Sequence, residues 1–326
     1  MDISFDISET DKISEYFNEN GYVVINNVFT AAECKEIFEH VGEMLQKFEP
    51  KFNIYDISTY DLISQCVSKY GIISRGSNID PFWLNLRQHP NIYKCGKIFI
   101  DDFIVSHDKF IFYRPTKDVL VDGKVCQKIE WGSEYIYPGL HLDMDPKLYY
   151  HNDTKAVEII RENTDYRNPS TFISEGHVCL KSEGLYLQGM INVLNNNEND
   201  GGFTCVPGFP QKFDEWFLKR EHEAPFTEVG KYVFNKFSHA DMDHVWNMKR
   251  IPSKAGSLII WDRRMAHTGK PNVSNRQRLG IPIAFTPKCG IVSHLRSNRR
   301  KEIKKMIDAH NFNEKLTDVG KIVYDL

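Results

Sequence analysis

The sequence predicts a mainly β fold with flanking helices, of the sandwich or jelly-roll type. From about residue 100 the chain consists of short apolar runs, most of them bounded by Gly, Pro, Asn or Asp. Such runs with turn residues between them are typical of antiparallel sheets rather than of alternating β-α units. The runs are FIFY (110–113), YIYPGLHLDM (135–144), LYLQGMINVL (185–194), GFTCVPGF (202–209), SLIIW (257–261) and LGIPIAF (279–285).

The first residues predict the order helix, strand, helix. Ser14–Asn20 is amphipathic and Gly21 follows it as a stop signal. Tyr22–Asn27 is rich in β-branched and aromatic residues, which favours a strand. Thr30 then precedes AAECKEIFEHVGEMLQ, and Glu33 stands three positions after it. This spacing predicts a capping box at the start of a second helix.

The remaining segments connect or follow the predicted strands. Asn195–Gly202 (NNNENDGG) predicts a turn, because its residues favour turn conformations. Asp145–Gly176 and Gln211–Lys254 are interpreted as longer, partly helical insertions. Ser297–His310 predicts a basic amphipathic helix, for which packing on the sheet is a better interpretation than nucleic-acid binding.

We expect one catalytic domain over residues 1–326, because no internal repeat or hinge linker is visible. It would comprise a helical layer with one strand (about 1–100), a jelly-roll core (about 100–290) and a helical tail (about 291–326).

Charge and cysteine content exclude several classes of protein. The chain has 41 basic and 44 acidic residues, a formal charge of −3, which favours neither nucleic acid nor an anionic membrane as partner. Its seven cysteines are odd in number and form no CxxC, so a disulfide framework or thiolate zinc site is not expected. The acidic N-terminus has no signal-peptide core and no apolar run is long enough to span a membrane. We therefore expect a cytoplasmic protein.

Three His-x-Asp sequences occur, and one fits a metal site best. On a strand, a His and an Asp one residue apart point to the same face. With a distant His they form a facial triad for Fe(II) that leaves positions for a bidentate 2-oxo acid and O2. His151-Asn152-Asp153 lies in a polar stretch, and His239-Ala240-Asp241 stands too close to His267 for several strands to fit between. The apolar strand with His141 and Asp143 leaves that room, so we predict iron at His141, Asp143 and His267.

The segment after the distal histidine contains a candidate cosubstrate cation. A strand bears His267, a polar turn follows, and Arg278 opens the next strand eleven residues later. A dicarboxylate bound to a metal at one end needs a partner at the other, and a planar guanidinium binds carboxylate through two hydrogen bonds. Alone, Arg276 and Arg278 would be interpreted as surface charges of a hairpin. Together with the triad, they favour Arg278 as the cosubstrate residue.

Four segments resemble a known family, the phytanoyl-CoA dioxygenases. GYVVINNVFTAAEC is similar to the opening strand and helix of that family, LHLDMDP to its metal strand, GGFTCVPGF to its central Gly-rich segment, and HTGKPNVSNRQR to its His…Asn…Ser…Arg segment. In the last, Asn272, Ser274 and Arg278 stand at the family's spacing, and the likeness extends over most of residues 12–285. The resemblance implies a double-stranded β-helix (cupin-like) fold, iron at the three predicted ligands, and 2-oxoglutarate held through Arg278.

The chain also departs from the family pattern. Gly256-Ser257 stands where Gly-Asp is usual, and Thr268 replaces the usual small Gly or Ser, so its hydroxyl could lie near the cosubstrate. Gln188 could hydrogen-bond substrate or 2-oxoglutarate, although a polar residue satisfied within the sheet is an equal interpretation. The stretch between Pro146 and Gly184 is longer than usual and is expected to shape the substrate mouth. Core packing is favoured for three tyrosines on predicted strands: Tyr113, Tyr135 and Tyr137.

The leading functional hypothesis is an Fe(II)/2-oxoglutarate-dependent dioxygenase. It would use O2 to hydroxylate an unactivated C–H bond of a small organic substrate and convert 2-oxoglutarate to succinate and CO2. The carboxylate ligand Asp143 disfavours halogenation, whereas desaturation and ring closure stay open. A zinc hydrolase with the same ligands lacks an evident general base and leaves Arg278 unexplained. A non-catalytic jelly-roll binding protein has no need for these groups together.

Overall fold

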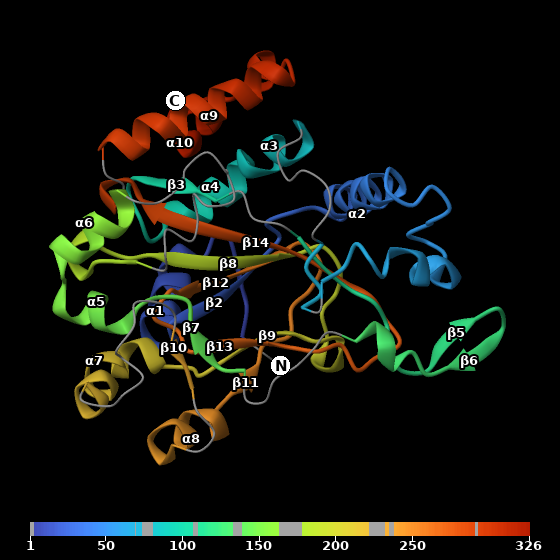
Figure 1. Cartoon of the computed structure of the whole chain (residues 1–326), viewed down its shortest axis with the longest axis horizontal. Helices are drawn as coiled ribbons and strands as arrows, with labels where there is room; N and C mark the ends of the chain where they lie inside the picture. The colour runs from blue at the N-terminus through green and yellow to red at the C-terminus, as the bar shows by residue number, and fades with distance from the viewer. Residues whose placement is uncertain are drawn as a thin grey trace.

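The computed structural model describes residues 3–68, 70–73, 81–106, 110–132, 139–162, 178–221, 232–234, 238–290 and 293–326. Two sheets form the centre of this part of the chain, and helices surround them (Figure 1). Helices make up 44% of the described residues and strands 22%. Helical residues therefore outnumber strand residues, contrary to the expectation of a mainly β chain, because the connections and both ends of the chain are helical.

The helices and strands have the following bounds. The helices are α1 (Thr10–Asn20), α2 (Ala31–Gln46), α3 (Pro81–Arg87), α4 (Pro90–Lys97), α5 (Pro146–His151), α6 (Thr154–Glu162), α7 (Phe209–Arg220), α8 (His239–Trp246), α9 (Ser293–Ala309) and α10 (Asp318–Tyr324). The strands are β1 (Phe5–Asp6), β2 (Tyr22–Asn26), β3 (Phe103–Val105), β4 (Ile111–Tyr113), β5 (Val119–Val121), β6 (Lys124–Cys126), β7 (His141–Leu142), β8 (Leu187–Asn192), β9 (Gly202–Cys205), β10 (Tyr232–Val233), β11 (Lys249–Arg250), β12 (Ser257–Asp262), β13 (His267–Lys270) and β14 (Arg278–Pro287).

The larger sheet has the strand order β1-β2-β12-β8-β14-β3, and β4 also pairs with β14. Its pairs are antiparallel except for β1 with β2. Alternation along β8 sends Leu187 and Ile191 into a core shared with α2, α3, α4 and α9, while Met190 faces the opposite way. The strand that we assigned to the N-terminal layer, β2, is thus an inner strand of the main sheet, because its apolar residues pair along β12.

The smaller sheet has the order β10-β7-β13-β9-β11 and is antiparallel. Its residues share a second core with the inner face of the larger sheet. The ring of Phe203 on β9 stacks on that of Trp261 on β12, with centroids 4.2 Å apart. The two sheets therefore face each other across this second core.

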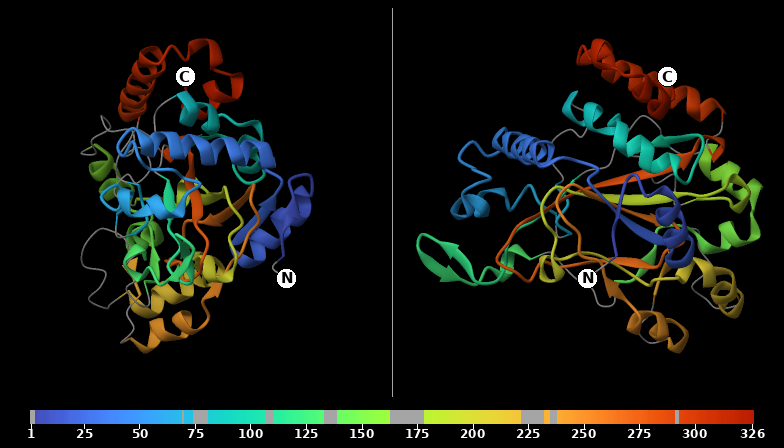
Figure 2. Two further views of the ribbon diagram at one scale, coloured as in Figure 1. Left: turned by 90° about the vertical axis from the view of Figure 1, so that its right-hand side faces the viewer. Right: turned by 180° about the vertical axis from the view of Figure 1, so that it is seen from behind.

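The outer parts of the chain cover the larger sheet or extend from the body. Helices α9 and α10 lie over α3, α4 and the end of β14, whereas the β5–β6 hairpin projects from the opposite side (Figure 2). Ile303 and Ile307 of α9 are buried in the larger core, which confirms that the basic tail helix packs on the protein. Among the described residues, no helix is long and apolar enough to cross a membrane. All seven cysteines are free thiols.

The predicted capping box at the start of α2 is confirmed. The Thr30 hydroxyl accepts a hydrogen bond from the Glu33 amide at 3.2 Å, and the Glu33 carboxylate accepts one from the Thr30 amide at 2.7 Å. We expect Thr30→Ala to lower the free energy of unfolding by about 1 kcal/mol, because the Glu33 amide loses its acceptor and the Glu33 carboxylate loses the Thr30 hydroxyl as a donor. Urea unfolding measures this loss. Thr30→Ser should recover most of it, and equal stability of the Ala and Ser variants would contradict the prediction.

Candidate metal centre and cosubstrate pocket

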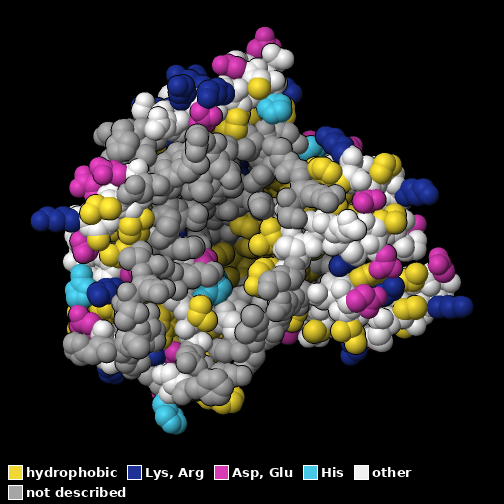
Figure 3. Space-filling model, in the orientation of Figure 1, with side chains coloured by type: hydrophobic (Ala, Val, Ile, Leu, Met, Phe, Trp, Pro, Cys, Tyr) yellow, Lys and Arg dark blue, Asp and Glu magenta, His cyan; other side chains and the backbone are white. Residues whose placement is uncertain are grey.

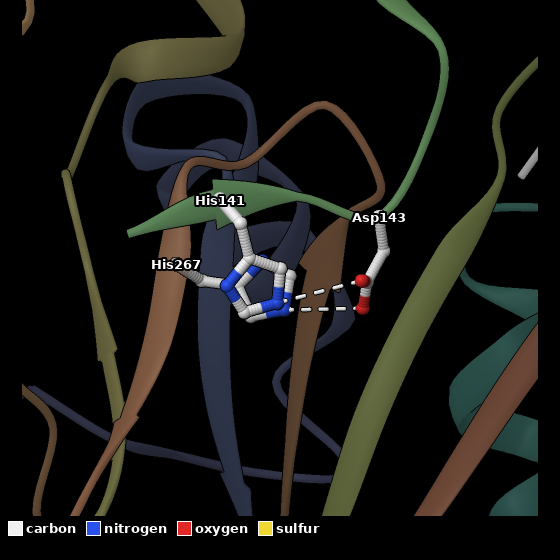
Figure 4. Close-up of side chains that lie close together, drawn as sticks. All are labelled: His141, Asp143 and His267. Carbon is white, nitrogen blue, oxygen red and sulfur yellow. Dashed lines mark ion pairs between the residues drawn. The ribbon is translucent and has the colours of Figure 1, made fainter. Parts of the chain in front are cut away.

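Two histidines lie side by side on neighbouring strands of the smaller sheet. His141 on β7 is the direct pairing partner of His267 on β13. Paired residues of antiparallel strands point to the same face, so both imidazoles enter the space between the sheets. Their ring centroids are 4.5 Å apart (Figure 4). The antiparallel register thus brings together two side chains that are far apart in the sequence.

Asp143 completes the cluster from the segment just after β7. Its Oδ1 lies 3.4 Å from Nε2 of His141, and its Oδ2 lies 3.4 Å from Nε2 of His267 (Figure 4). One potential ligand atom from each of the three residues falls within 4.8 Å of the others. Among the described residues this is the one group of His, Cys, Asp or Glu that meets such a criterion. The structure therefore brings the three predicted ligands together.

Backbone carbonyl groups orient both imidazoles toward Asp143. Nδ1 of His141 lies 2.8 Å from the carbonyl oxygen of Gly139, and Nδ1 of His267 lies 2.9 Å from that of Met265. A carbonyl oxygen can only accept, so in each neutral ring the proton is on Nδ1 and Nε2 presents a lone pair. Two lone pairs and a carboxylate then converge on one point, which is a donor arrangement that fits a divalent metal ion.

Protonation preferences agree with this donor set. Burial acts to raise the pKa of Asp143, but hydrogen bonding and charge from His141 and His267 outweigh it and hold that pKa well below its usual value. Burial lowers the pKa of His267, and the nearby His141 acts in the same direction. An ionised carboxylate and a neutral imidazole are the forms that bind a metal.

Arg278 is a buried cation at the start of β14. Its residue surface is 2% exposed, and its guanidinium carbon lies 5.1 Å from the ring centroid of Tyr113 on the paired strand β4. Burial lowers its pKa, while Tyr113 and Asp200 act in the opposite direction. Within the described part of the chain no carboxylate forms an ion pair with Arg278, and its buried Nε has no hydrogen-bond partner. Because an unpaired buried charge is costly, the site suits a bound carboxylate.

The strand pairing relates Arg278 to the histidines. A Cβ atom placed on Gly202 of β9 would lie 2.8 Å from the guanidinium carbon of Arg278, so the cation packs against that strand. A Cβ atom on Gly269 would lie 3.5 Å from the Tyr113 hydroxyl. Gly269 stands two residues after His267 on β13 and shares its face, which is a rise of roughly 7 Å. Arg278 and His267 thus lie along the same pair of neighbouring strands, β9 and β13.

Curated proteins resemble the chain over most of its length. A Dictyostelium discoideum protein named "Putative phytanoyl-CoA dioxygenase" is 29% identical over 302 residues, which cover 90% of this chain and 80% of that protein. The Ava biosynthesis cluster protein O of Aspergillus versicolor is 22% identical over 260 residues, which cover 77% and 69%. The chain is therefore similar to a protein that bears the phytanoyl-CoA dioxygenase name. The family resemblance predicted from the sequence is confirmed.

A solved structure shares the fold of this chain. It is the crystal structure of GlcNAc Inducible Gene 2 (DUF1479) from Candida albicans, with a TM-score of 0.55 at 16% identity. The match covers 87% of this chain and 66% of the other, just under two thirds of its length. At this identity the likeness extends to the fold alone. No family model matches the chain.

The two other His-x-Asp sequences lie elsewhere and have other partners. His151 ends α5 and forms an ion pair with Glu221 at 2.9 Å. Asp241 in α8 is fully buried, where it pairs with Arg220 and accepts a hydrogen bond from the Tyr232 hydroxyl at 3.0 Å. These partners explain both motifs without a metal, as the sequence context suggested.

The remaining predicted site residues have different surroundings. Gln188 donates a hydrogen bond to Oδ2 of Asp143 at 3.0 Å, so it contacts a candidate ligand. Thr268 follows His267 directly, and strand alternation places its side chain on the opposite face, which does not favour a cosubstrate contact. Arg276 forms an ion pair with the buried Asp200 at 2.9 Å. Tyr135 and Tyr137 lie outside the described residues.

Two residues that hold Asp143 were not recognised from the sequence. Arg263 donates from Nε to the backbone oxygen of Asp143 at 3.0 Å. Trp261 donates from its indole nitrogen to Gln188 at 3.1 Å and thus reaches Asp143 through that residue. Asp262 forms an ion pair with Arg264 at 2.6 Å. Trp261 could have been found by counting alternate residues along the predicted strand, but the Arg263 contact depends on tertiary structure.

The face of the molecule in Figure 3 is hollowed near its centre. Hydrophobic side chains line the hollow, which opens over β8 and β14 as they are seen in Figure 1. On the inner face of these strands Met190 and Ala284 are apolar, whereas Gln188 and Arg278 are polar. This mixture suits an organic ligand whose few polar groups are held at fixed points.

Proposed function

We propose that this chain is an Fe(II)/2-oxoglutarate-dependent dioxygenase with a double-stranded β-helix core. Its reaction would hydroxylate an unactivated C–H bond of a small organic substrate. The observation that carries the proposal is the combination of the His141–Asp143–His267 cluster with Arg278, a buried guanidinium without a carboxylate partner among the described residues. The dioxygenase name of the Dictyostelium relative supports it. A zinc hydrolase or a binding protein requires no unpaired cation at this place.

The residues have separate tasks in this proposal. His141 and His267, each with Nδ1 held by a backbone carbonyl, would present Nε2 to the metal, and Asp143 would supply a carboxylate oxygen. Arg278 would bind the far carboxylate of 2-oxoglutarate and thereby set the direction in which the cosubstrate enters. When bound, iron with 2-oxoglutarate and O2 supplies the oxidising power for C–H hydroxylation and releases succinate and CO2. Apolar side chains between the sheets would exclude water from the reacting atoms.

Binding under anaerobic conditions followed by a single exposure to O2 tests the proposal. We expect 2-oxoglutarate to bind tightly only in the presence of Fe(II), measured by calorimetry, and succinate to form only after O2 is admitted. Succinate comes from 2-oxoglutarate itself, so the assay can be run before the primary substrate is known. Zinc in place of iron should support binding but no succinate. Hydrolase activity with zinc, or no interaction with 2-oxoglutarate at all, would favour one of the two alternatives instead.

A further inference from the structure

The carboxylate of Asp143 is a candidate ligand just beyond the end of a strand. Strand β7 ends at Leu142, and Asp143 is the next residue. Its Oδ1 and Oδ2 each lie 3.4 Å from an imidazole nitrogen. The terminal bond of a carboxylate side chain has a broad torsional preference, so hydrogen bonds to its oxygens decide the orientation.

Gln188 and Trp261 support the Asp143 carboxylate by hydrogen bonds from the larger sheet. Gln188 on β8 and Trp261 on β12 are directly opposed in the antiparallel register, so both side chains leave the same face of the larger sheet. The Trp261 indole nitrogen donates to Oε1 of Gln188 at 3.1 Å, and Nε2 of Gln188 donates to Oδ2 of Asp143 at 3.0 Å. Arg263 holds the main chain of the same aspartate through its carbonyl oxygen.

Only one arrangement of donors and acceptors is possible along this series of hydrogen bonds. An indole N–H can only donate and a carboxylate can only accept, whereas an amide has one group of each kind. Trp261 therefore engages the carbonyl end of Gln188 and turns its NH2 toward Asp143. The reverse orientation would place two donors together at Trp261 and two acceptors together at Asp143. The indole thus acts on Asp143 without touching it.

We propose that Gln188, oriented by Trp261, is a positioning residue that holds the Asp143 carboxylate in the plane needed for metal binding. This inference rests on the metal site of the proposed function and adds a role for the facing sheet. The smaller sheet and its adjoining loop supply the three ligands, and the larger sheet sets the orientation of one of them. Partners behind metal ligands typically change metal affinity by 10–100-fold when they are removed.

Cobalt(II) binding to the purified, metal-free protein tests the proposal without any turnover. We expect Gln188→Leu to weaken Co(II) binding by roughly 10–100-fold in calorimetry and to alter the visible absorption of the bound ion. Gln188→Met has nearly the same length but cannot donate to Asp143, so it should bind no better than the Leu variant. Trp261→Phe should also weaken binding, by a smaller factor, because it keeps an aromatic ring beside His267 but removes the hydrogen bond to Gln188.

The matched control is Trp131→Phe. The Trp131 indole also donates to a carboxylate, that of Asp61, at 2.5 Å, but it lies outside the cluster and should leave Co(II) affinity unchanged. If Trp261 acts through Gln188, the double variant Gln188→Leu/Trp261→Phe should bind Co(II) about as weakly as Gln188→Leu alone, because both remove one coupled interaction. Thermal unfolding of each variant separates a general loss of stability from this effect.

The outcomes distinguish this inference from the proposed function. Wild-type affinity and spectrum in both Gln188→Leu and Trp261→Phe would overturn the positioning role. The metal site itself would still be supported if the unmodified protein binds Co(II). Additive losses in the double variant would show that Trp261 acts by packing rather than through Gln188. If the wild-type protein binds no Co(II), the metal site fails and the positioning role fails with it.

Discussion

Arg278→Ala is expected to raise the 2-oxoglutarate concentration needed for half-maximal turnover by about 100-fold or more. The far carboxylate of the cosubstrate would enter a buried space with no other cation paired to it, and removing one partner of a buried ion pair typically costs about 3–5 kcal/mol. Each 1.4 kcal/mol corresponds to about tenfold in affinity. Iron binding should change little, because Arg278 contacts none of the three ligands. Succinate formation at graded 2-oxoglutarate concentrations measures the first quantity, and metal analysis of the Fe(II)-loaded variant measures the second.

Arg276→Ala is the matched control, since Arg276 stands two residues earlier on the same hairpin. Its guanidinium is engaged with Asp200 and its side chain is 52% exposed. This variant removes an ion-pair partner of Asp200, but its 2-oxoglutarate requirement should be that of the wild type. A crippled Arg276→Ala beside a normal Arg278→Ala would show that the wrong arginine has been assigned. Wild-type behaviour of both, without consumption of 2-oxoglutarate, would refute the oxygenase proposal.

His267→Ala is expected to abolish both stoichiometric Fe(II) binding and succinate formation. The wild-type protein should bind about one Fe(II) per chain, and the variant loses one of three protein ligands at a site where His141 and Asp143 alone cannot complete the set. His141→Ala and Asp143→Ala should have the same result. Metal analysis after anaerobic loading and gel filtration measures the stoichiometry. Full activity of His267→Ala would show that His267 is not a metal ligand.

The controls for this prediction are the other two His-x-Asp motifs. His151→Ala and His239→Ala should bind Fe(II) as the wild type does, because His151 pairs with Glu221 and His239 is exposed at the start of α8. Loss of iron in either variant, with iron retained in His267→Ala, would move the metal site to another part of the chain.

The local parts of the structure were those that the sequence predicted well. The capping box at Thr30 and the strand Ser257–Asp262 depend on short-range signals, and the structure has both. The partners of each strand were not predictable, because strand pairing is decided by contacts distant in the chain. The N-terminal strand β2 therefore appeared peripheral, although β12 pairs along most of its length.

The candidate site shows the same division between local and tertiary signals. His141 and Asp143 share a local motif, and the distal His267 was found because strand and turn patterns surround it. The contact of Gln188 with Asp143 crosses between the two sheets and leaves no mark in either local sequence. Thr268 was considered for its hydroxyl alone, without regard to the face to which the strand directs it. Residue type identified the ligands, while geometry was needed for the groups that orient them.

If the proposed metal site is correct, the shortness of β7 makes metal supply part of the energetics of folding. This strand has only two residues, one of which is a candidate ligand paired with the other histidine across a single register position. A bound ion would therefore act as a cross-link between a weakly held strand and its neighbour. An ion that binds only the folded chain, at a free concentration 100 times its dissociation constant, adds about 2.7 kcal/mol to stability. In a cell short of iron, such a protein would be depleted by unfolding and degradation as well as inactive, so its abundance would follow the metal.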